Sequence, residues 1–147
     1  MTSTRNVYRI LDAAANRGRE ALRVLEDLAR FLDDSPELAA RLKDARHRFA
    51  DVADLLDRDE RLDARDSAND VGAAIEADGE YRRDSLLQIV VANCARLQES
   101  ARSLEEFSKL VEPSLARRWE QIRYDAYELE KLVYAAAKRF LDAQDDK

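Results

Sequence analysis

The chain has 147 residues, enough for one domain with its own core but too few for a phosphate-binding (β/α)8 barrel, which needs about 200 or more. With 46% hydrophobic and 38% charged residues but only three glycines and two prolines, the composition favours an all-helical protein over an all-β or doubly wound fold. The net charge of -6 disfavours nucleic acid or an anionic membrane as partner, because both attract an excess of lysine and arginine.

Two further features bear on location. The single cysteine, Cys94, can form no internal disulfide and is predicted to be a small core residue. The N-terminus has no apolar signal core, and the longest uncharged run, 85–95, is shorter than the roughly 20 residues that a membrane span needs. We therefore expect a soluble, cytoplasmic protein.

Hydrophobic periodicity predicts four helices. The first covers about 8–32, and its polar arc includes Asp12 and Glu26. Pro36 begins the second, which continues to the high fifties. A connector of about 58–83 follows and could include a short helical turn. The third helix covers about 84–111 and ends before Pro113, and the fourth covers about 114–140, after which the last six residues are predicted to fray.

An internal repeat decides the expected architecture. Seven positions of the first helix reappear in the third helix at one constant offset. Pro36 reappears as Pro113 at a slightly shorter offset, and the residues of the second helix match those of the fourth at this same shorter offset. Two copies of one αα-hairpin, each with an apolar face to bury, predict a four-helix bundle with an approximate two-fold axis. The expected single domain, 1–147, comprises repeat 1 at about 5–56, the connector, and repeat 2 at about 84–140. Matched charged pairs are Arg17 and Arg96, Glu20 and Glu99, and Arg23 and Arg102.

The charged residues of the repeat allow two interpretations. They can form a solvated face with weak ion pairs between residues three and four apart. Alternatively, the two-fold axis brings both copies together, so that Glu20, Arg23, Glu99 and Arg102 line a shared cleft in which arginines bind phosphate. Asn93 lies on the apolar arc of the third helix, where its amide either bonds a backbone group or contacts a ligand.

The connector carries an Asp-rich segment that the rest of the chain does not repeat. Asp66 and Asp70 could hold Mg²⁺, which takes one or two carboxylates and completes its shell with water and substrate phosphates. Gly72 allows backbone amides to face an anion. The alternative is an Asx-rich surface turn. The chain lacks the glycine-rich phosphate loops, G-x-x-x-x-G-K-[ST] and G-x-G-x-x-G, and the zinc motif H-E-x-x-H.

The stretches 8–31, 70–72, 80–83, 92–109, 123–124 and 130–131, which include RGREALRVLEDLARF and ANCARLQESARSLEEFSK, resemble a small bacterial family. This is the alternative hydroxymethylpyrimidine-phosphate kinase family of thiamine biosynthesis, unrelated to the ribokinase-like enzyme and found alone or fused ahead of thiamine phosphate synthase. The resemblance covers about 7–134. One departure is Ala14, where we expect the family to carry asparagine, as at Asn93.

The resemblance implies transfer of a phosphoryl group from ATP, with Mg²⁺, to hydroxymethylpyrimidine phosphate. On this basis we expect Arg23, Arg102 and Asp70 to be catalytic and Asp66 and Asp70 to hold the metal. Expected contacts with phosphate or substrate are Arg17, Glu20, Arg65, Gly72, Asn93, Arg96 and Glu99, of which Asn93 and Glu99 would meet the pyrimidine. Buried arginines would also make the enzyme reject the unphosphorylated alcohol.

Two alternatives belong to other classes: a non-catalytic helical module that associates with thiamine phosphate synthase, and an all-α nucleotide pyrophosphohydrolase. The sequence leaves a homodimer open.

Overall fold

The fold is known from a computed structural model, which describes residues 2–147. The helices are α1 (Thr4–Phe31), α2 (Pro36–Ala53), α3 (Arg58–Ala64), α4 (Leu86–Ser108) and α5 (Ala116–Asp145), with the 3₁₀ turn η1 (Pro113–Leu115) before α5. Residues 2–147 contain no strand, so the predicted all-α fold is confirmed.

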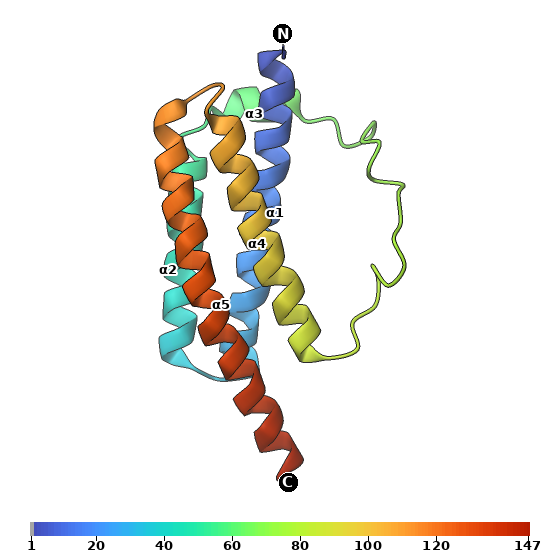
Figure 1. Ribbon diagram of the computed structural model, residues 1–147, viewed down its shortest axis with the longest axis vertical. Coiled ribbons are helices and arrows are strands. Elements are labelled where there is room, and N and C mark those ends of the chain that lie inside the picture. The colour runs from blue at the N-terminus through green and yellow to red at the C-terminus, as the bar shows by residue number, and fades with distance from the viewer. Residues whose placement is uncertain (1) are drawn as a thin grey trace.

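Four long helices form a bundle in which α1 is antiparallel to α2 and α4, and α4 is antiparallel to α5 (Figure 1). α1 packs against both α2 and α4, and α5 packs against α4 and, less extensively, α2. The short helix α3 lies at the end of the bundle where α1 begins, and the connector 65–85 passes outside the bundle to the opposite end, where α4 starts (Figure 1). Within the described residues, no helix has both the length and the apolar character needed to cross a membrane.

Capping residues fix the hairpin turns where the sequence places them. After α1 the backbone reverses at Asp34, whose φ is +50°, and the Ser35 hydroxyl accepts a hydrogen bond from the Leu38 amide at 3.2 Å. Pro36 then occupies the first turn of α2, where its missing amide proton costs no hydrogen bond. Pro113 opens η1 in the equivalent turn between α4 and α5. Both prolines therefore act as predicted.

Several predicted boundaries need correction, and the first is the end of α2, which lies at Ala53 and not in the high fifties. The first part of the predicted connector is the full helix α3, capped by the Asp57 carboxylate, which accepts from the Glu60 amide at 2.9 Å. α4 begins at Leu86, behind its cap Ser85, and not at 84. The predicted fraying of the last six residues is wrong as far as Asp145, where α5 ends.

Two carboxylates expected on the solvent-facing arc of α1 are buried. Asp12 is 4% exposed and Glu26 is 1% exposed. Each is paired with an arginine from another element, Arg65 for Asp12 and Arg46 for Glu26. A buried charge is tolerated only when it is paired and hydrogen-bonded, so partners distant in sequence explain why the helical pattern alone misplaced both residues.

The two hairpins contain the same ion pairs at repeat-related positions. Arg46 Nε lies 2.7 Å from Glu26 Oε2 and joins α2 to α1, and Arg123 Nε lies 2.8 Å from Glu105 Oε2 and joins α5 to α4. Superposition of 5–56 on 84–140 by an approximate two-fold rotation remains our prediction, and these matched pairs agree with it.

The core includes Cys94, which is 2% exposed, as the sequence predicted. Burial, with a smaller contribution from the Glu130 charge, raises the pKa of the Cys94 thiol to about 12. Because thiol reagents attack the thiolate, we expect Cys94 not to react with a disulfide reagent at pH 8 in the folded protein. In denaturant the same thiol should react fully. Rapid reaction of the native protein would contradict this placement.

Candidate functional site

The start of the connector is fastened to α1 by arginine bonds. Arg65 binds the buried Asp12 carboxylate through both of its oxygens, with Nε 2.7 Å from Oδ2 and Nη2 2.9 Å from Oδ1. Arg9 donates to the Asp66 carbonyl oxygen at 3.1 Å. Arg65, expected to contact substrate, thus holds the connector instead. The pairing fixes where the following Asp-rich segment lies.

That segment forms one wall of a groove along α1, which we call the connector groove. Arg17 and Asp70, predicted separately from the helix and the connector, line it together. Its lining combines three apolar side chains with two guanidinium groups and two side-chain amides. Arg17 is exposed and makes no ion pair within 4 Å anywhere in residues 2–147. The lining residues are Asn6, Arg9, Ile10, Ala13 and Arg17 of α1 and Asn69, Asp70 and Val71 of the connector.

The two connector carboxylates are partly occupied by local hydrogen bonds. Asp70 Oδ1 accepts from the Gly72 amide at 2.9 Å, which is an Asx turn, and the Asn69 amide donates to both oxygens of Asp66 at 2.9 and 3.1 Å. Asp70 Oδ2 takes part in none of the hydrogen bonds formed by residues 2–147. Within that part of the chain, no three His, Cys, Asp or Glu side chains form a cluster suited to a metal ion.

A second groove lies beside the first, between α1 and α2, and we call it the basic groove. It consists of two adjoining hollows that share Arg23 and Arg46. One hollow also contains the predicted Glu20. The remaining lining residues are Asn16 and Arg19 in the first hollow and Glu26, Arg30, Ala39, Ala40 and Lys43 in the second.

Glu26 organises the arginines of the basic groove. Its carboxylate lies 2.7 Å from Arg46 Nε, 3.8 Å from Arg23 Nη1 and 4.0 Å from Arg30 Nη1. Burial by itself raises the pKa of the Glu26 carboxyl, but the Arg46 hydrogen bond and the three positive charges outweigh burial and hold the pKa below its usual value. Glu26 is therefore ionised and keeps these guanidinium groups in place.

The two grooves adjoin on the exposed side of α1. Ala13 lines the connector groove, and Asn16, three residues later, lines the basic groove. In the same way, Arg17 lines the connector groove and Glu20 lines the basic groove. Residues three apart on a helix are neighbours, with Cβ atoms about 5–6 Å apart. Ligands in the two grooves could thus meet across this part of α1.

The predicted residues of α4 lie elsewhere. Arg96 and Glu99 are exposed and line neither groove, and the Asn93 amide donates to the Ile89 carbonyl of its own helix at 2.9 Å. Arg102 binds Glu105 and Glu106, each at 3.2 Å. Ala14 is fully buried, so its side chain faces the core rather than a groove.

The structure does not bring Arg23 and Arg102 together. Both lie toward the C-terminal ends of their helices, and α1 and α4 run in opposite directions (Figure 1). The side chains are also half-exposed, at 50% and 55%, and not buried as the sequence led us to expect. Their shared feature is a local one, since each pairs with a glutamate three residues later.

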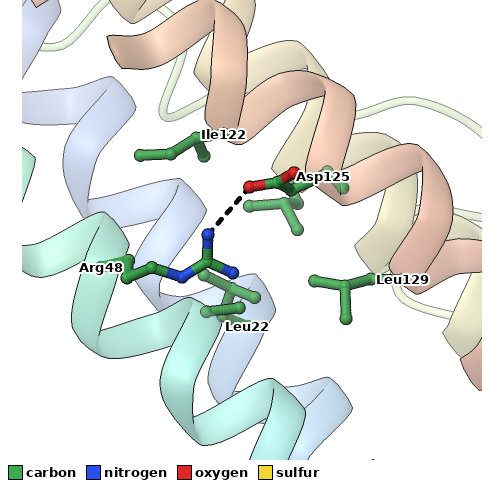
Figure 2. A pocket seen from close by; sticks show the side chains of 8 residues that line it. Leu22, Arg48, Ile122, Asp125 and Leu129 are labelled. Carbon is green, nitrogen blue, oxygen red and sulfur yellow. Dashed lines mark hydrogen bonds and ion pairs between the residues drawn. The ribbon is translucent and has the colours of Figure 1, made fainter.

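A third hollow is too small for a substrate. Figure 2 shows Arg48 of α2 and Asp125 of α5 meeting across an apolar pocket, with Arg48 Nη1 2.9 Å from Asp125 Oδ2. Its volume of about 10 Å³ is at the lower limit for one water molecule. Arg48 and Asp125 occupy equivalent positions of the two repeats, with the same offset as Pro36 and Pro113, so a two-fold axis relating the hairpins would pass through this pair.

Sequence reasoning missed several groove residues. Arg9, Asn69 and Val71 line the connector groove, and Lys43 and Arg46 line the basic groove. The repeat did pair Arg46 with Arg123, which was a usable signal for a shared role in the two hairpins. Nothing comparable marked Arg9 or Val71, because their meeting depends on the path of the connector.

A family model matches residues 9–132, which include every lining residue of the two grooves except Asn6. The chain belongs to the ThiD2 family. Curated relatives of this ThiD2 chain are named thiamine-phosphate synthase. They include proteins from Synechococcus sp. (strain CC9605), 41% identical over 84% of this chain and 34% of the relative, and Rhodopirellula baltica, 39% identical over 84% and 33%. A third, from Prochlorococcus marinus (strain MIT 9313), is 40% identical over 88% of this chain and 36% of its own length. The chain spans about a third of the length of these relatives, and no solved structure matches it.

Proposed function

We propose that the protein is a kinase that transfers the γ-phosphoryl group of ATP to 4-amino-5-hydroxymethyl-2-methylpyrimidine phosphate, giving the diphosphate, in thiamine biosynthesis. The observation that carries the proposal is ThiD2 family membership across residues 9–132. The connector groove supports it, because its lining of Arg17, two side-chain amides and apolar side chains suits a phosphorylated heterocycle.

The chemistry asks for positioning and neutralisation of charge more than for covalent catalysis. An oxygen of the pyrimidine phosphate attacks the γ-phosphorus, and the bond from that phosphorus to the β–γ bridging oxygen breaks with its electron pair remaining on ADP. The acceptor oxygen is already ionised near neutral pH, so this chain needs no general base. Arg17 on one side and Arg23 on the other would orient the two phosphate groups, and a magnesium ion would neutralise further charge.

The connector fits a magnesium ion that arrives with substrate phosphates. Asp70 Oδ2 and the Asn69 side-chain oxygen accept no hydrogen bond within residues 2–147 and are hard oxygen donors beside the groove. Asp70 would hold the ion, and Asp66 would hold the Asn69 side chain in place through its two hydrogen bonds. Bound there, Mg²⁺ would neutralise charge on the phosphoryl group during transfer.

The deciding experiment is incubation of purified protein with ATP, Mg²⁺ and the pyrimidine phosphate. A kinase releases ADP only when the pyrimidine phosphate is present, and the pyrimidine diphosphate appears in equal amount. A nucleotide hydrolase would release phosphate or pyrophosphate without the acceptor. A protein that produces neither product in the presence of both substrates would contradict the proposal.

The enzyme should prefer the monophosphate over the free hydroxymethylpyrimidine by about 10- to 100-fold in kcat/KM, corresponding to a charge-assisted hydrogen bond of about 1.5–3 kcal/mol. This range counts only the contact between Arg17 and the phosphate and is a lower bound, because the hydroxyl of the free alcohol is not ionised and the proposed site has no general base to activate it. Kinetics with the two acceptors, at saturating ATP, measure the ratio. Equal kcat/KM values would show that Arg17 does not bind the acceptor phosphate.

A non-catalytic module is the second candidate, favoured by one observation: the relatives are about three times as long and are named thiamine-phosphate synthase. If the protein is the kinase, we propose that its product, the pyrimidine diphosphate, passes to such a synthase, whether fused or separate. The assay above separates the two functions, because a module would make no ADP.

A further inference from the structure

The basic groove contains more positive charges than are required to neutralise the buried Glu26 carboxylate. Around Glu26 the groove and its rim have five basic and three acidic side chains, a surplus of two positive charges in a protein whose net charge is -6. Arg19 and Lys43 make no ion pair within 4 Å among residues 2–147. The basic side chains are Arg19, Arg23, Arg30, Lys43 and Arg46, and the acidic ones are Glu20, Glu26 and Asp27.

The corresponding face of the second hairpin has lost this surplus. The positions of Arg19 and Lys43 are taken there by Gln98 and Glu120. Gln98 donates its amide to the Glu130 carboxylate. Four basic residues then face four acidic ones, a net charge of zero; they are Arg102, Lys109, Arg117 and Arg123 against Glu99, Glu105, Glu106 and Glu120.

The buried pair itself is unchanged between the hairpins, so it cannot explain this difference. Arg46 and Glu26 in one hairpin, and Arg123 and Glu105 in the other, hold the helices together at 2.7 and 2.8 Å. A structural role accounts for one arginine and one glutamate in each copy. The additional cations of the first hairpin, Arg19 and Lys43, therefore need another explanation.

We infer that the basic groove of the first hairpin binds the phosphate chain of the nucleoside triphosphate, and that the second hairpin has no equivalent site. The inference rests on the proposed kinase function and assigns its two substrates to different grooves: the triphosphate beside Arg19, Arg23 and Lys43, and the pyrimidine phosphate beside Arg17. A linear triphosphate with several negative charges matches a row of half-exposed cations spread over two adjoining hollows. The neighbouring connector groove then receives the γ-phosphoryl group.

Lys43→Glu, which introduces the residue found in the second hairpin, tests this assignment without any catalytic assay. Calorimetric titration with inorganic triphosphate and with ATP, in EDTA, should show affinity at least tenfold weaker in Lys43→Glu than in the wild-type protein. Arg19→Gln should act in the same direction. The matched control is Lys138→Glu, the same substitution on an exposed part of α5, which should bind as the wild type does. Thermal melts check that each variant is folded.

The outcomes separate this inference from the proposed function. Triphosphate binding that Lys43→Glu weakens, in a protein that makes no pyrimidine diphosphate, would leave the groove assignment standing and remove the kinase. Equal binding by wild type and Lys43→Glu, or equal weakening by Lys138→Glu, would overturn the assignment even if the kinase were active. Binding of ATP without binding of inorganic triphosphate would also overturn it, because the base and not the phosphate chain would then supply the affinity.

Discussion

Gly18→Ala should lower the free energy of unfolding by about 1–3 kcal/mol, since an added methyl group would overfill the contact between α1, α2 and α4. A Cβ atom at this position would lie 2.3 Å from Cζ of Phe49 and 2.7 Å from Oγ of Ser100, both far inside normal contact distance. Urea denaturation followed by circular dichroism measures the loss. Gly72→Ala is the control, because only the flexible Asp70 carboxylate approaches that Cβ, at 3.3 Å.

The repeat offers a way to restore the packing. In the first hairpin, Gly18 lies against Phe49. The repeat-related residues of the second hairpin are Leu97 and Ala126, so the small and the large residue have changed places. Phe49→Ala alone should cost about 3–5 kcal/mol, because it leaves a cavity and removes the edge-to-face contact with Trp119 at 5.1 Å between ring centroids. Gly18→Leu in the same chain should recover at least about 1 kcal/mol of that loss. Strictly additive effects of the two substitutions would show that these sites do not share one space.

The helices, their hairpin turns and the offset of the repeat could be predicted because each leaves a local signature. Apolar spacing marks the helices, and Pro36 and Pro113 mark the turns. The burial of Asp12 could not be predicted in the same way, since its partner Arg65 comes from a distant segment of the chain. A helical wheel contains no information about a partner from another element.

The candidate site was only partly predictable for the same reason. Residue chemistry pointed to arginines and to the Asp-rich connector, and Arg17 and Asp70 do lie in one groove. The expected two-fold symmetry was misleading, because it suggested one cleft shared by Arg23 and Arg102. These arginines lie toward the C-terminal ends of α1 and α4, and the two antiparallel helices place those ends at opposite ends of the bundle (Figure 1). The divergence between hairpins, as at Lys43 and Glu120, is more informative about ligands than their similarity.

Asp70→Asn should reduce phosphoryl transfer by about a hundredfold or more while leaving stability within about 0.5 kcal/mol. Asparagine keeps a side-chain oxygen for the Gly72 amide, so the Asx turn survives. The substitution removes only the negative charge beside the groove. The rate is measured at saturating and limiting Mg²⁺, alongside a thermal melt of both proteins.

Asp78→Asn provides the matched control, because it makes the same change on an exposed part of the connector outside the groove. If the Asp-rich segment is only a surface turn, the two variants should be alike, with unchanged turnover and a cost of a few tenths of a kcal/mol. If Asp70 holds the ion, it alone should lower the rate and shift the Mg²⁺ dependence to higher concentration. An unchanged Mg²⁺ dependence in Asp70→Asn would exclude Asp70 as a ligand and direct the search for the metal to Glu20 and Asp27, the carboxylates at the basic groove.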